Sequence, residues 1–149
     1  MDKLAVSKMD QSIADLASKC DQKILAIWAS DCAERVLPCF EEKHPYDDRP
    51  RRAIEAGRAW ANGKLKMIGA RKAAFAAHAA ARNAEHVPEA RSAARSAGHA
   101  AATAHVASHA LYAAIYAATA VCDAANSSNA ITLERNWQYK HLLELGDKC

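Results

Sequence analysis

The chain has 149 residues, a formal net charge of +3 at pH 7 and a charged fraction of 25%. This length is sufficient for one domain with a real core, and we expect a single domain over residues 1–149. Because charges of both signs are spread along the chain, no basic block predicts a nucleic-acid partner. Lysines and acids interrupt the apolar residues of segment 1–19, and no apolar run is long enough to span a bilayer. We therefore expect a cytoplasmic protein without a signal peptide or a membrane contact.

The five cysteines are odd in number and include no CxxC pair. A disulfide framework and a structural zinc site are therefore both disfavoured. Cys32 and Cys39 share a predicted helix face with Trp28 and Val36, so we interpret them as small core residues. We expect the terminal Cys149 to be exposed.

Two amphipathic helices are predicted at the amino-terminal end of the chain. Apolar residues three or four positions apart define the first, whose stripe consists of Met9, Ile13, Leu16 and Cys20. The second spans about residues 21–43 and has the richest apolar stripe of the chain. Pro38 lies inside it and has no backbone donor, so we expect a kink or a break one turn earlier.

A loop follows in the segment HPYDDRP, where two prolines bracket Asp47 and Asp48. We expect these acids to pair partly with the arginines that come directly after them. Pro50 is expected to open the third helix, because a missing N–H group costs little in a first turn. This helix is predicted to bury Trp60 and to end at Gly63, which readily adopts the left-handed conformation of a cap.

Residues 69–126 are dominated by alanine, the residue with the highest helix propensity. Helical phase gathers the alanines on one face of each predicted helix and places arginine, histidine and tyrosine on the opposite face. Alanine faces let helix axes approach closely, so we expect tight helix packing in this half of the chain. The alanines that we expect in these contacts include Ala77, Ala80, Ala97 and Ala101.

The alanine-rich segment is expected to form three helices. Pro88 separates the first from the second, and we expect a further turn at residues 102–104, with Thr103 as a candidate cap. A single helix over residues 89–125 would be about 55 Å long, which is too long for a compact domain of this size. A closing helix over residues 131–145 follows, with Leu133, Trp137 and Leu142 available to bury. The sequence therefore predicts an all-α fold: one compact bundle of about seven helices, with close-packed alanine-rich helices in the carboxy-terminal half.

Four histidines lie on the non-alanine faces of the predicted helices, namely His78, His99, His105 and His109. His105 and His109 are four residues apart and could bind one metal ion, so a metal- or small-ligand-binding bundle is the alternative function. However, no HExxH motif is present and the spacing fixes no third ligand. We therefore favour imidazoles that fill gaps between helices, and we expect no cofactor.

Two further surfaces have open interpretations. Tyr112 and Tyr116 could line a groove for a partner, because tyrosine is common in interfaces, or they could be half-buried with only their hydroxyl groups in water. The arginines of the alanine helices could form a basic ridge that meets acidic groups on another macromolecule, although we favour a solvated face. These arginines are Arg71, Arg82, Arg91 and Arg95.

No catalytic motif accompanies these surfaces. The chain contains no GxSxG segment, and its five glycines are too few for a loop that binds phosphate groups. No Cys/His pair is supported by spacing. We therefore expect a protein that is not an enzyme.

A family resemblance completes the sequence evidence. It rests on four segments in order, CAERVLPCFEEKHPYDDRPRRAIEAGRAWANG, ARKAAFAAHAAAR, AARSAGHAAATAHVASHALYAAIYA and ERNWQYKHLLEL. Together these segments, from about residue 32 to residue 145, resemble the bacterial and archaeal putative immunity proteins associated with polymorphic toxin systems. The resemblance implies a small cytosolic helical protein that binds and neutralises a cognate toxin without catalysis.

The resemblance carries over no catalytic residues. The residues that we select as partner-binding candidates are His78, His99, His105, His109, Tyr112, Tyr116, Asp47 and Asp48. Whether these positions serve folding or toxin contact is left open by the motif. Many toxin-neutralising proteins are acidic and this chain is not, so a nuclease partner would require a local acidic patch.

Overall fold

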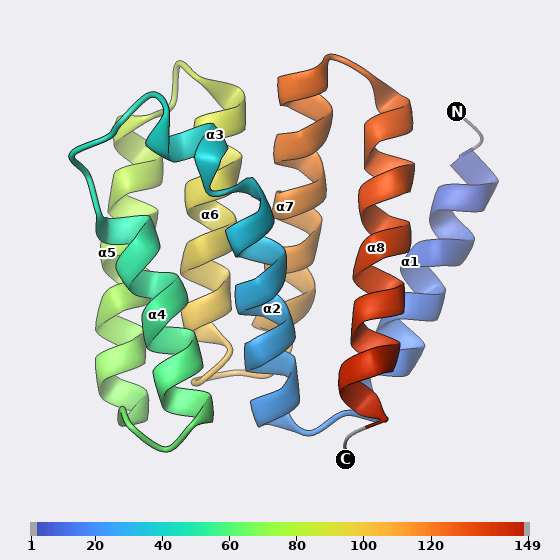
Figure 1. Ribbon diagram of the computed structural model, residues 1–149, viewed down its shortest axis with the longest axis horizontal. Coiled ribbons are helices and arrows are strands. Elements are labelled where there is room, and N and C mark those ends of the chain that lie inside the picture. Colours follow the sequence, from blue (N-terminus) through green and yellow to red (C-terminus); the bar gives the residue numbers. More distant parts are fainter. Residues whose placement is uncertain (1–2, 148–149) are drawn as a thin grey trace.

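The computed structural model describes residues 3–147, with side chains from Lys8 to Asp147. Throughout this range the chain is all-α, which confirms the predicted fold class (Figure 1). The expectation for Cys149 lies outside the described residues. In chain order the helices are α1 (Lys3–Ala17), α2 (Gln22–Val36), α3 (Pro38–Glu41), α4 (Arg49–Ala61), α5 (Met67–Asn83), α6 (Pro88–Ala102), α7 (His109–Ala125) and α8 (Ser128–Gly146).

Residues 3–147 thus form eight helices where the sequence predicted about seven. The difference arises at Pro38, which starts the short helix α3 directly after α2 ends at Val36. Because proline has no N–H group to donate to the preceding turn, the chain breaks here. The break lies at Leu37, directly before Pro38, and not one turn earlier as expected. Gly63 has a φ of 73° after α4, which confirms the left-handed cap.

Helices α5, α6 and α7 lie side by side in one layer, with α6 in the middle. On one side of this layer α4 packs against α5 and α6, and α2 packs against α6 and α7 (Figure 1). Helix α8 packs beside α7, and α1 packs on α8. None of the described helices packs over the opposite side of α6.

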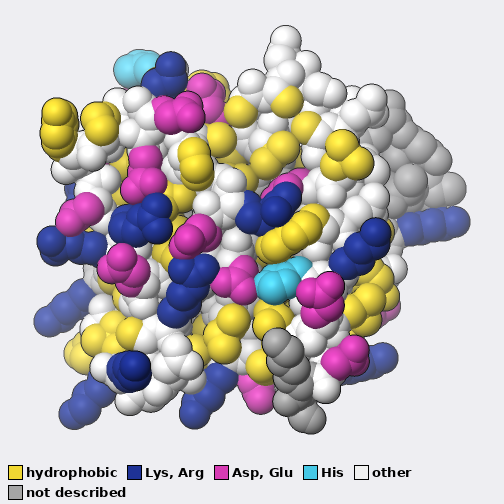
Figure 2. Space-filling model, in the orientation of Figure 1, with side chains coloured by type: hydrophobic (Ala, Val, Ile, Leu, Met, Phe, Trp, Pro, Cys, Tyr) yellow, Lys and Arg dark blue, Asp and Glu magenta, His cyan; other side chains and the backbone are white. Residues whose placement is uncertain are grey.

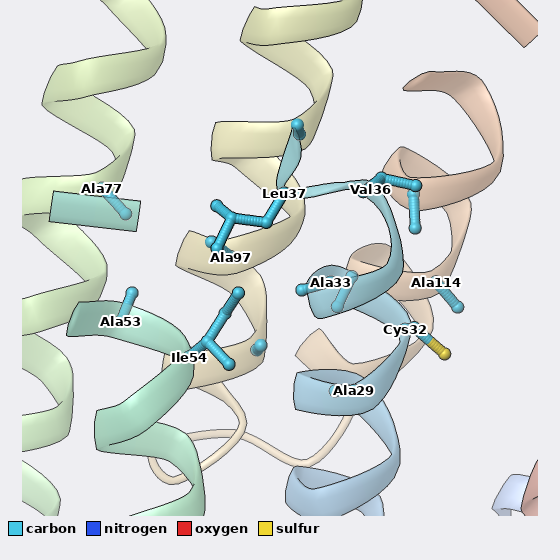
Figure 3. Close-up of a cluster of buried hydrophobic side chains, with 14 of the residues drawn as sticks. Ala29, Cys32, Ala33, Val36, Leu37, Ala53, Ile54, Ala77, Ala97 and Ala114 are labelled. Carbon is cyan, nitrogen blue, oxygen red and sulfur yellow. The ribbon is translucent and has the colours of Figure 1, made fainter. Parts of the chain in front are cut away.

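The core lies between the layer of α5, α6 and α7 and the helices α2 and α4. It combines alanine faces with a few large side chains. Ala77, Ala80, Ala97 and Ala101 have no exposed surface, so the predicted alanine contacts are confirmed. The largest buried side chains include Trp28, Phe40, Leu37, Ile54 and Leu142. Figure 3 shows Leu37 and Ile54 beside Ala97 of α6. Small residues on α5, α6 and α7 therefore bring the backbones together, while the segment from α2 to α4 and helix α8 supply the larger apolar side chains.

Close backbone approach is most evident where α2, α4 and α6 meet. A Cβ atom on Gly57 of α4 would lie 2.7 Å from Ser30 Oγ on α2 and 3.2 Å from the carbonyl oxygen of Ala100 on α6. Only glycine fits this position without a shift of its neighbours. Cys32 is buried nearby on α2, and burial raises the pKa of its thiol well above the ordinary value, as expected for a core cysteine.

Buried hydrogen bonds fix α8 against the rest of the bundle. Trp28 Nε1 on α2 donates to the carbonyl oxygen of Gln138 at 2.9 Å, and Gln138 Nε2 donates to the carbonyl oxygen of Ala114 on α7 at 2.8 Å.

The structure corrects two predictions about which side chains are buried. Leu133 of α8 was expected to be buried but is 71% exposed, and Trp60 of α4 is only half-buried.

Residues 103–108 form the turn between α6 and α7, so the segment 89–125 is two helices. Thr103 is the C-cap residue of α6, and its Oγ1 donates to the carbonyl oxygen of His99 at 3.0 Å. The turn is longer than the one predicted, and it contains His105. No helix of residues 3–147 is long and apolar enough to cross a membrane.

Candidate partner-binding face

The side of the α5, α6 and α7 layer that points away from α2 and α4 is called here the outer face. It carries a polar and aromatic stripe from each helix, whereas the alanines on the other sides of these helices are buried. The stripes are formed by Arg71, Phe75, His78 and Arg82 on α5, by Arg91, Arg95 and His99 on α6, and by His109, Tyr112 and Tyr116 on α7. One side of each alanine helix therefore packs the core, and the other presents functional groups.

Five rings on the outer face contact one another and form what we call the ring cluster: His78, His99, His109, Tyr112 and Tyr116. His99 of α6 lies at its centre. Its ring centroid is 4.8 Å from that of His78 on α5, 5.1 Å from that of His109 and 5.3 Å from that of Tyr116 on α7. Tyr112 completes the cluster at 5.4 Å from His99. The cluster therefore joins all three helices of the layer.

Hydrogen bonds orient three of these rings. Arg95 Nη1 on α6 donates to His78 Nδ1 at 3.0 Å, so Nδ1 of His78 acts as an acceptor. The Nδ1 atoms of His99 and His109 lie 2.9 Å apart, and one of the two rings must donate to the other. The imidazoles are thus held by partners on the outer face itself.

The histidines at the centre of the cluster are held in the neutral form. Burial lowers the pKa of His78 to about 4, and the charge of Arg95 adds to this effect. Burial lowers the pKa of His99 to about 4 as well, with a further contribution from His78. The pKa of His109 is also lowered, first by burial and then by His105. Near neutral pH the cluster is therefore an uncharged aromatic surface beside charged arginines.

Gly98 makes room for this arrangement. A Cβ atom on Gly98 would lie 2.7 Å from both Cε1 and Nε2 of His78. The His78 ring therefore lies directly on the backbone of α6, between Arg95 and His99. The space that a side chain at position 98 would need is thus used by an imidazole.

The rim of the cluster is exposed and apolar in part. Phe75 is 60% exposed and Tyr112 is 52% exposed, which is unusual for large aromatic side chains. The guanidinium of Arg71 lies 5.4 Å from the centroid of the Phe75 ring. Aromatic side chains with nearby arginine are enriched at the centres of protein interfaces. This composition fits a surface that another macromolecule covers.

The other predicted candidates are not members of the ring cluster. His105 was placed on the same helix stripe as His109, but it is exposed in the turn before α7, because the helix begins only at His109. Asp47 pairs with Arg49 at 2.7 Å and Asp48 pairs with Arg52 at 2.7 Å, as expected for a loop that neutralises itself. The arginine hydrogen bond lowers the pKa of the Asp47 carboxyl.

The geometry gives no support to the alternative of a metal site. Among the described residues, no group of three or more histidine, cysteine, aspartate or glutamate side chains is placed to hold a metal ion. A cavity of about 210 Å³ lies between α1, α2 and the start of α7, but none of the histidines lines it. This volume is below the range of about 300–1,000 Å³ that is usual for small-ligand sites. A hollow of about 460 Å³ at loop residues 43–47 is within that range, but none of the four candidate histidines lines it.

The opposite face, formed by α2, α4 and α8, has a different character. Basic and acidic side chains alternate over it (Figure 2). Arg58 contacts Asp31 and Glu34 at 2.7 and 2.6 Å, and Arg35 binds Glu134 through two hydrogen bonds of 2.8 and 3.0 Å. Charges on this face are therefore largely paired within the protein.

Sequence reasoning found the members of the ring cluster but missed their contacts. It also missed the role of Gly98 beside His78 and the ion pairs of the opposite face. The sequence does contain a signal for the role of Gly98. Arg95 and His99 lie within one turn of Gly98 on α6, and His78 shares a helix stripe with Arg82. The signal for the pairs of Arg35 and Arg58 described above was absent, because each of them joins residues more than 20 positions apart.

Comparison with known proteins adds a family to this geometry. Residues 15–145 match the Imm-5 like putative immunity protein family. The resemblance drawn from the four sequence segments is thereby confirmed, and it extends further towards the amino terminus than expected. A comparison with curated proteins finds no match, and a comparison with solved structures finds none either.

Proposed function

Because the chain belongs to the Imm-5 like putative immunity protein family, we propose that it binds a cognate toxin and neutralises it without catalysis of its own. The observation that supports this most directly is the ring cluster, which lies on a helix layer whose outer side no described helix covers. We assign the toxin contact to the outer face.

Preorganisation supports this assignment. The rings of the cluster stack on one another, and Arg95 is held by His78, so few rotamers remain to be fixed when a partner binds. Ordering flexible side chains costs roughly 0.5–1.5 kcal/mol each in an association. A surface that is already ordered avoids much of this cost and can bind tightly.

A non-catalytic role is supported by the composition of the cluster. It contains no serine, cysteine or carboxylate side chain that could act as a nucleophile beside the histidines. The low pKa values of His78 and His99 also place their titration far from neutral pH. Neutralisation would then follow from covering or distorting the toxin.

Co-expression tests the proposal directly. The gene should be expressed in bacteria together with a toxin-like gene found beside it, and growth and complex formation should be measured. We expect growth to be restored and the two proteins to co-purify, whereas an unrelated toxin should not be neutralised. If the wild-type protein neither restores growth nor forms a complex with any product of a neighbouring gene, the proposed function is wrong.

A further inference from the structure

The arginines of this protein divide into two groups. Six of the ten form ion pairs with carboxylates at 2.6–3.6 Å, and all six lie on α2, α4 or α8. These six are Arg35, Arg49, Arg51, Arg52, Arg58 and Arg135. The other four are Arg71, Arg82, Arg91 and Arg95 on the outer face. Among the described residues, no carboxylate lies within ion-pair distance of these four.

Acidic residues are nearly absent from the outer layer. In α5, α6 and α7 the only acids are Glu89 in the first turn of α6 and Asp123 in the last turn of α7. Glu85 lies in the connection between α5 and α6, where its nearest basic group is His86 at 3.8 Å. The middle of the outer face therefore carries positive charge that nothing in the described chain neutralises.

Neutral groups nevertheless orient three of the four arginines. Arg95 donates to His78 Nδ1 at 3.0 Å, Arg91 donates to the carbonyl oxygen of Glu85 at 3.3 Å, and Arg71 lies over the Phe75 ring. Each guanidinium has five N–H donors, so most of its donors remain available for a planar acceptor such as a carboxylate. The arginines are thus positioned without being paired.

We propose that the outer face binds an acidic surface on the toxin, with carboxylates of the toxin pairing with Arg82, Arg91 and Arg95 around the aromatic centre. This inference rests on the proposed function and adds the chemistry of the partner. The outer face is positive, whereas the charges of the opposite face are largely paired within the protein. An acidic partner would therefore be attracted to the outer face. Complementary charge also speeds association and excludes wrong partners.

A protein partner fits the composition better than a nucleic acid does. The three helices contain five lysine and arginine residues in total, one of them a lysine, which is fewer than the roughly six to ten basic contacts of a protein that neutralises six to ten phosphates. The arginines instead surround exposed aromatic side chains and neutral imidazoles. Arginine and tyrosine enrichment with few lysines is the composition of protein interface centres.

Charge reversal tests the inference. The double variant R82E/R91E changes two exposed arginines that are not members of the ring cluster, and R82K/R91K keeps their charge. The matched control is K23E/K140E, which makes the same change of charge at exposed residues of α2 and α8. Affinity for the neighbouring toxin, inactivated by mutation, should be measured by calorimetry at low and high salt, with a DNA duplex as a second probe. The thermal midpoint of each variant shows that it is folded.

We expect R82E/R91E to weaken toxin binding by about tenfold or more, whereas K23E/K140E stays within about twofold of the wild type. R82K/R91K should lie between the two, because lysine keeps the charge but lacks the planar donors of the guanidinium. High salt should weaken the wild-type complex and leave the R82E/R91E complex nearly unchanged. If the complex forms but R82E/R91E binds as tightly as the wild type, the acidic-partner inference is wrong and the proposed function stands. Arginine-dependent binding of the DNA duplex without an effect on the toxin would assign the face to nucleic acid instead. If the wild type forms no complex with any neighbouring toxin, both proposals fail.

Discussion

The ring of His78 occupies the space that a side chain on Gly98 would need. Two of its ring atoms lie 2.7 Å from the position of a Cβ atom on that glycine. This contact fixes how closely α5 and α6 approach at the outer face, and it sets the position of His78 against Arg95 and His99. The cluster on which the proposed function rests therefore depends on one small residue.

Replacing Gly98 with alanine should destabilise the protein, although alanine favours a helix over glycine by about 1 kcal/mol. The added methyl group would collide with an imidazole that Arg95 and His99 hold in place, so we expect a loss of about 1–3 kcal/mol. Denaturant unfolding measures this loss. In a His78→Ala background the same change should be neutral or stabilising, and an equal loss there would contradict the contact.

Leucine at the alanine contacts should overpack the bundle. Ala77 and Ala97 have no exposed surface, and replacing either with leucine is expected to cost about 1–3 kcal/mol. Ala124 is exposed near the end of α7 and is the matched control, where leucine should be nearly neutral. Denaturant midpoints across the three variants check this, and neutral core variants would show that the helix faces are wrongly assigned.

Stability should fall as the pH falls towards the histidine pKa values. His78 and His99 have a pKa of about 4 in the folded protein, mainly because of burial, whereas an unfolded histidine titrates near 6.5. Between these values the unfolded state binds more protons, so the free energy of unfolding decreases from about pH 7 to about pH 4. Carboxylates in ion pairs add to this loss of stability at the lower end of the pH range. A histidine variant must therefore be compared with the wild type at each pH.

Replacing His99 with glutamine should make this pH dependence shallower, because one of the groups that gains a proton on unfolding is removed. The control is His86→Gln, since His86 is exposed and far less constrained. Unfolding by denaturant at several pH values measures both. Parallel curves for wild type and His99→Gln would mean that His99 is not kept neutral by the fold.

The ion pair between α2 and α8 should be sensitive to loss of its basic partner. Glu134 is buried, and Arg35 supplies two hydrogen bonds to it while lying 4.0 Å from the Trp137 ring centroid. Replacing Arg35 with alanine leaves a buried carboxylate without this partner, and we expect a loss of about 1–3 kcal/mol. In a Glu134→Gln background the loss should be smaller, which a double-mutant cycle of denaturant midpoints can show.

The sequence carried enough information for the fold class and for the alanine contacts, because helical phase separates buried from exposed positions in α5, α6 and α7. Pro38 and Gly63 indicated helix ends because proline has no backbone N–H group and glycine readily adopts the left-handed conformation. Leu133 was misjudged because an apolar residue at helical spacing does not reveal whether another helix covers it. His105 was misjudged because the turn that contains it, residues 103–108, lacks glycine and proline.

The candidate site was predicted in its members and not in its geometry. Periodicity placed His78, His99 and His109 on separate helix faces, but only the packing of three helices brings their rings within about 5 Å. The unpaired state of the arginines was equally hidden. Whether a surface arginine has a carboxylate partner depends on contacts between helices that are distant in the sequence.

The most direct test of the account is the effect of Tyr112→Ala on affinity for the neighbouring toxin, compared with Tyr46→Ala. Both tyrosines are exposed, by 52% and 99%, but Tyr112 lies on the outer face and Tyr46 lies in the loop before α4. We expect Tyr112→Ala to weaken binding by about tenfold or more, as at an interface hot spot, and Tyr46→Ala to leave it unchanged. Loss of binding with Tyr46→Ala, with none for Tyr112→Ala, would contradict the assignment of toxin binding to the outer face.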